Sequence, residues 1–81
     1  MELDWKKINS GCIEAYLGQY HVITILEEGQ FFKWYCELPF GTDNYVGREI
    51  GKANTLKRAA LDATQKVEEW ITKANLKPVS P

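Results

Sequence analysis

The stretch FFKWYC, residues 31 to 36, places four aromatic side chains in six positions of an 81-residue chain. Alternate residues of a β-strand face opposite sides of the sheet, so a strand here puts Phe32, Trp34 and Cys36 on one face. The other face then holds three residues: Phe31, Lys33 and Tyr35. A single packed layer can bury only one of these faces, so the second aromatic face needs an explanation.

Short runs rich in β-branched and aromatic residues surround this stretch, and glycines recur between them. Strands are predicted at about residues 12–17, 20–27, 30–38 and 45–52, and residues 4–8 can add a short edge strand. Residues 27–30 (EEGQ) are typical of a hairpin turn in which Gly29 supplies a positive φ, and residues 39–44 of a longer loop. The pattern predicts an antiparallel meander of three or four strands.

Residues 55–74 carry the spacing of an amphipathic helix. The apolar stripe consists of Leu56, Ala59, Ala60, Ala63, Val67, Trp70, Ile71 and Ala74. Asn54 or Thr55 is suited to the N-cap, and Pro78 prevents the helix from continuing. On the polar face, three i,i+4 ion pairs are expected: Arg58–Asp62, Asp62–Lys66 and Glu69–Lys73.

We therefore expect an α+β fold, in which residues 1–76 form one domain and residues 77–81 form a flexible tail. The C-terminal helix packs on one face of the sheet, and its alanines leave room for Phe32 and Trp34. Trp70 and Ile71 close the far end of that core. The strand at 20–27 shows no clean alternation, which is typical of a central strand covered on both sides.

Three alternatives explain the second aromatic face. In the first, the N-terminal segment with Trp5 and Ile8 folds over Phe31 and Tyr35 as a minor core. In the second, two copies pair through this face, because large apolar patches usually mark an interaction site. In the third, Phe31, Tyr35 and Lys33 form a platform on which unpaired bases stack.

Composition bounds the class of protein. No run approaches the roughly 20 apolar residues of a membrane span, and residues 1–11 lack the apolar core of a secretory signal, so a cytoplasmic protein is expected. Cys12 and Cys36 have neither metal-ligand spacing nor the density of a disulfide scaffold, so both are expected to be free thiols.

Catalytic chemistry is not predicted. His21 is the only histidine, and no serine or cysteine has an identifiable base beside it. One histidine and two scattered cysteines do not form a coordination shell. We expect no enzyme, no metal and no cofactor.

Basic residues gather in the sequence near the junction of the last strand and the helix. The net charge is −1, but residues 1–45 carry three bases and seven acids, whereas residues 46–81 carry seven bases and four acids. Bases beside a helix N-terminus oppose the helix dipole unless an anion is bound there. The candidate nucleic-acid-binding residues are Arg48, Lys52, Lys57 and Arg58.

Residues 31–67 resemble the second half of a double-stranded-RNA-binding domain, with strands, a glycine-rich approach and an alanine-rich helix. The positions that match are Thr55, Lys57, Ala59 and Ala63. Leu56 and Ala60 stand where that family has lysines, and residues 12–27 are predicted as strand where it has a helix. This resemblance implies RNA binding.

Most of the chain is similar to small phage- and prophage-encoded proteins with a Trp-led start, paired aromatic strands and a G-x-A-x-T-L-x-x-A entry to a helix. The matching residues are Gly51, Ala53, Thr55, Leu56 and Ala59. This likeness implies a packing motif and an accessory protein that acts by occupying a host protein or a nucleic acid.

The function predicted from these observations is that of a non-enzymatic binding module. It is expected to contact another protein, or a second copy of itself, through Phe31, Lys33 and Tyr35. The alternative is a nucleic-acid-binding protein that uses the basic junction together with the exposed aromatic residues.

Overall fold

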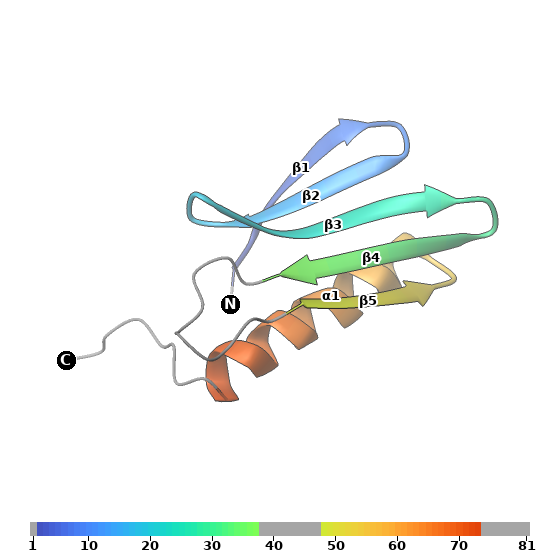
Figure 1. Ribbon diagram of the computed structural model, residues 1–81. Coiled ribbons are helices and arrows are strands. Elements are labelled where there is room, and N and C mark those ends of the chain that lie inside the picture. Colours follow the sequence, from blue (N-terminus) through green and yellow to red (C-terminus); the bar gives the residue numbers. More distant parts are fainter. Residues whose placement is uncertain (1, 38–47, 74–81) are drawn as a thin grey trace.

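Five strands follow one another along the chain and pair in that same order (Figure 1). The computed structural model describes residues 2–37 and 48–73. Its elements are β1 (Asp4–Asn9), β2 (Cys12–Leu17), β3 (Tyr20–Glu28), β4 (Phe31–Glu37), β5 (Arg48–Ala53) and α1 (Leu56–Lys73). Each strand is antiparallel to its neighbours.

The α+β class and the meander are confirmed, but the predicted count of three or four strands is too low. Residues 4–9 form a full edge strand paired with β2. The sequence of β1, DWKKIN, does not alternate apolar with polar residues, and all of its residues are exposed. The strand is therefore held by backbone pairing with β2 and not by burial of its side chains. The predicted loop at 39–44, residues 45–47, Ala74, the helix-stop signal at Pro78 and the tail at 77–81 lie outside the described residues.

Two tight hairpins fix the register of the central strands. Gly18 and Gly29 have φ angles of 64° and 66°, in the left-handed region that glycine adopts without a steric penalty. The predicted positive φ at Gly29 is therefore confirmed. With β3 and β4 joined there, Ile25 lies opposite Trp34 and Ile23 lies opposite Cys36.

The missing alternation of β3 has a different cause from the one predicted. Ala15 pairs with Ile23 and Tyr16 pairs with His21, so Val22 is an extra residue in β3. Such a β-bulge shifts the alternation by one position, and Val22 and Ile23 are both buried although they are adjacent. No second layer over the sheet is needed to explain the pattern.

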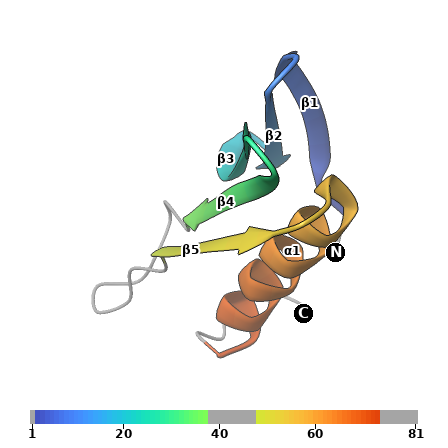
Figure 2. The same ribbon diagram turned by 90° about the vertical axis from the view of Figure 1, so that its right-hand side faces the viewer.

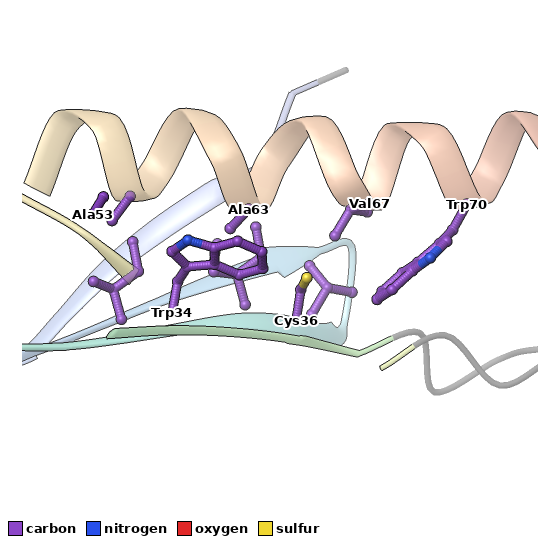
Figure 3. Close-up of a cluster of buried hydrophobic side chains, with 11 residues drawn as sticks. Trp34, Cys36, Ala53, Ala63, Val67 and Trp70 are labelled. Carbon is purple, nitrogen blue, oxygen red and sulfur yellow. The ribbon is translucent and has the colours of Figure 1, made fainter. Parts of the chain in front are cut away.

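The core lies between α1 and the sheet (Figure 3). Ala59 and Ala63 have no exposed surface, so the helix approaches closely enough for the Trp34 ring to fill the space beneath it. Trp70 closes the far end of this core, as predicted, and Cys36 is a buried hydrophobe as predicted. Thr55 is the N-cap, because its Oγ1 accepts a hydrogen bond from the Arg58 backbone N–H at 3.1 Å.

The helix packs against β3, β4 and β5 and does not reach β1 or β2. Figure 2 shows α1 on one side of the curved sheet, with no described helix or strand on the opposite side. We call the side that faces α1 the inner face and the opposite side the outer face. Within the described part of the chain, no helix therefore covers the inner face over β1 and β2.

Candidate functional site on the outer face of the sheet

The outer face of β4 carries the three residues predicted to share it. Tyr35 pairs with Ile50 and Lys33 with Lys52 on β5, whereas the inner-face Trp34 pairs with Gly51. Paired residues of an antiparallel sheet project from the same face. The outer face at β4 and β5 therefore carries a set that we call the Lys–aromatic cluster: Phe31, Lys33, Tyr35, Ile50 and Lys52.

Two lysines lie directly opposite each other in this cluster. Lys33 Nζ lies 5.4 Å from the centre of the Tyr35 ring, and Lys52 Nζ lies 4.8 Å from the centre of the Phe31 ring. Each cation–π contact at an exposed site contributes about 0.5–1 kcal/mol. These contacts offset part of the repulsion that like charges on opposed strands experience. Neither lysine has an ion pair within residues 2–37 and 48–73.

The aromatic rings of the cluster are not covered by the N-terminal segment, which was one of the alternatives. Trp5 pairs with the core residue Ala15 and so lies on the inner face. β1 extends the sheet sideways and does not fold across it. Phe31 and Tyr35 are half-buried, and Ile50 is 53% exposed.

The outer face of β2 and β3 is occupied by a polar network. Tyr16 donates a hydrogen bond to Glu14 Oε1 at 2.7 Å, and this bond raises the pKa of Tyr16. His21 stacks on the Tyr16 ring at 5.2 Å between ring centres. His21 Nε2 lies 2.8 Å from Thr24 Oγ1 and 3.1 Å from the Ile23 carbonyl oxygen. The network therefore fixes the orientation of the chain's single histidine.

The four basic residues predicted at the strand–helix junction are not brought together. Arg48 stands at the opposite end of β5 and donates to Glu37 Oε2 at 2.6 Å, which raises the pKa of Arg48. Arg58 Nε lies 3.0 Å from Asp62 Oδ1, as predicted for this pair. Lys52 belongs to the Lys–aromatic cluster on the outer face, whereas α1 lies on the inner side.

Lys57, the last of the four predicted basic residues, is exposed.

The ion pair predicted between Asp62 and Lys66 does not form. Lys66 Nζ instead lies 3.3 Å from Glu69 Oε1, because an i,i+3 partner is equally close on a helix. The Lys73 side chain lies outside the described part of the helix.

A hollow of about 340 Å³ opens on the inner face beside the first turn of α1. Its lining is mainly apolar and includes Ile13, Ile25, Phe32 and Leu56, with Lys7 at its border. Leu56 is 37% exposed although it begins the predicted stripe. The reason is that β2, which would have to lie beneath it, is beyond the reach of the helix.

Cys12 and Cys36 are both free, as predicted. Burial raises the pKa of the Cys36 thiol to about 12, with a smaller contribution from Glu49. Among the described residues, no three metal-ligating side chains gather. Within the same ranges, no helix has the length and apolar character to cross a membrane.

The sequence predicted Phe31, Lys33 and Tyr35 but missed Ile50 and did not connect Lys52 with them. Alternation along REIGKA, residues 48 to 53, was the available signal, since it puts Ile50 and Lys52 on one face. The alternation alone does not show that these two residues lie beside β4, because that depends on the pairing of the two strands.

Searches of family models, curated proteins and solved structures find no match for this chain.

Proposed function

We propose that this protein is a non-enzymatic binding module that holds another protein on the outer face of its sheet, at the Lys–aromatic cluster. One observation carries the proposal. Lys33 and Lys52 stand opposite each other with no ion pair among the described residues, and Phe31, Tyr35 and Ile50 surround them. Two cations on one face, each held over an aromatic ring, favour a ligand that brings both negative charge and apolar groups.

The partner surface that fits is acidic and partly aliphatic. A carboxylate beside Lys33 or Lys52 would pair with a cation that has no ion pair among the described residues, and an aliphatic side chain would cover Ile50, whose side chain is half-exposed.

Nucleic acid fits the cluster less well. A base stacks on the open face of an aromatic ring, but Lys33 lies over the Tyr35 ring and Lys52 over the Phe31 ring. The basic residues predicted to hold phosphates are divided between the two sides of the sheet, and two of them are paired with acids. Nucleic-acid binding is therefore the competing outcome of the same experiment.

Fluorescence anisotropy with labelled probes tests the proposal. The first probe is a peptide that alternates Glu with Leu, and its controls replace Glu by Lys or Leu by Ser. The second probes are single- and double-stranded oligonucleotides. We expect saturable binding of the Glu–Leu peptide alone, weakened about tenfold or more by the paired substitution Lys33→Glu and Lys52→Glu.

The matched control makes the same change of charge away from the cluster, with Lys57→Glu and Arg58→Glu. A second pair compares Ile50→Ser with Leu61→Ser, because Leu61 is 45% exposed on the helix. Circular dichroism confirms that each variant is folded. Equal weakening by both charge pairs, or binding of the oligonucleotides in preference to the peptide, would overturn the proposal.

A further inference from the structure

Strand β1 lies at the margin of the sheet, and all of its residues are exposed. It pairs with β2 on one side, and no other described strand pairs with its free edge. Such an edge presents a row of backbone donors and acceptors that another strand can pair with. The β-bulge in β1 falls between Lys7 and Asn9. The stretch from Asp4 to Lys7 is therefore regular along its length.

Among residues 2–37 and 48–73, no helix covers the inner side of this margin. Trp5 faces the inner side, is 38% exposed, and lies beyond the reach of α1. The apolar hollow beside Ile13 and Leu56 adjoins the same uncovered part of the sheet. A partner that continued the sheet at β1 would bury the Trp5 ring and extend the inner layer.

We propose that the partner at this edge is a second copy of the chain, with β1 paired antiparallel to β1 about a twofold axis and Trp5 opposite Trp5. A symmetric antiparallel pair keeps each residue on its own face, so one residue lies opposite its own copy. If that residue were Asp4, Lys6 or Lys7, like charges would meet on the axis. Trp5 is the residue of this stretch that avoids such a meeting.

The same register brings opposite charges together. With Trp5 on the axis, Asp4 of each copy lies opposite Lys6 of the other, and both pairs are on the outer face. Lys6 already faces that side, because its Nζ lies 4.9 Å from the centre of the Tyr16 ring. Trp5 then meets its own copy on the inner face, where two aromatic rings on opposed strands stabilise a sheet.

Sedimentation equilibrium across a concentration series, from micromolar to about millimolar, tests the proposal. We expect the unaltered chain to form a dimer. Asp4→Lys and Lys6→Asp should each raise the dissociation constant about tenfold or more, because twofold symmetry converts two attractive pairs into two repulsive ones.

Mixing the two variants is the decisive step. A chain with Asp4→Lys carries two lysines at these positions, and a chain with Lys6→Asp carries two aspartates. An equimolar mixture should form a heterodimer, detected as a single mixed mass by native mass spectrometry, and the double variant should dimerise again. Glu28→Lys, at an exposed position away from β1, is the matched control and should leave the dissociation constant unchanged.

A chain that stays monomeric at the highest concentration overturns the proposal. So does a dimer that Asp4→Lys leaves unaltered, or a mixture that forms no heterodimer. Because the peptide probe binds on a different surface, these results are independent of the function proposed for the Lys–aromatic cluster.

Discussion

Gly51→Ala is the single substitution that tests the packing of this fold most directly. Gly51 pairs with Trp34, and the indole ring lies across the glycine. A Cβ atom placed on Gly51 would overlap two carbon atoms of the indole and lie 2.8 Å from its Nε1. The ring cannot move toward the helix, because α1 closes the space above it (Figure 3) and Trp34 is only 7% exposed.

The magnitude follows from two opposing effects. In a strand without the ring, replacing glycine by alanine stabilises the folded chain by about 0.5–1 kcal/mol. Displacing the ring costs about 1–3 kcal/mol for overpacking, with an upper limit of about 3–5 kcal/mol if its packing is lost. We expect the free energy of unfolding to fall by up to about 2.5 kcal/mol if the ring is displaced, and by about 2–4.5 kcal/mol if its packing is lost, out of the roughly 4–12 kcal/mol available to a domain of this size.

Urea and thermal unfolding of four chains measure the effect: the unaltered protein, Gly51→Ala, Trp34→Leu and the double variant. Each kcal/mol corresponds to about 4–8 °C in Tm. Trp34→Leu removes the ring and breaks no hydrogen bond among the described residues, because the buried Nε1 has no partner there. In this background Gly51→Ala should be neutral or stabilising.

The matched control is Gly18→Ala. Gly18 has a φ of 64° and nothing within 4 Å of its Cβ position, so its cost of about 1–2 kcal/mol comes from the backbone alone. That cost should be the same with and without the Trp34 ring. If Gly51→Ala lowers stability equally in both backgrounds, or not at all, the indole is not the reason that position 51 is glycine.

Three further outcomes are expected. Thr55→Ala removes the N-cap and should lower the free energy of unfolding by about 1 kcal/mol in urea; Thr55→Ser should restore it, and equal losses in both would contradict the role of the hydroxyl. The unfolded chain releases the Cys36 proton near its ordinary pKa of about 8.5, but the folded chain does so at about 12, so stability is complete below the first value and falls as pH rises between them. This fall, at most about 1.4 kcal/mol per pH unit, should be smaller in Cys36→Val, and identical alkaline slopes would refute it. Glu37→Gln breaks the exposed pair with Arg48 and should change stability by less than about 1 kcal/mol at moderate salt; a larger loss would mean that the pair supports the sheet.

The helix and the faces of the central strands follow from local patterns. The alternation of FFKWYC places Trp34 and Cys36 in the core, and the 3.6-residue period of 56–71 selects Ala59, Ala63, Val67 and Trp70 as the buried stripe. The positive φ of Gly29 and the N-cap role of Thr55 were also predicted from the local sequence and are confirmed. Each of these features depends on neighbours within about one turn of helix or one step of strand.

The candidate site could be predicted only in part for the same reason. Phe31, Lys33 and Tyr35 belong to one strand, so their common face was readable from the chain. Their meeting with Ile50 and Lys52 depends on a pairing between segments separated by residues 38–47. The sequence of β4 or of β5 alone does not determine which residues of the two strands lie opposite each other.

What the sequence by itself determined is therefore the periodic part of this protein: which side of each central strand is apolar, where the helix begins, and which thiol is buried. Only the tertiary structure decided that the possible edge strand at residues 4–8 is a full member of the sheet, that Val22 is inserted as a bulge, and that α1 stops short of β1 and β2. The physical reason is the distance along the sequence between the residues that interact. Periodicity is fixed by backbone geometry between near neighbours, whereas register and coverage depend on contacts between distant segments that compete for the same limited surface.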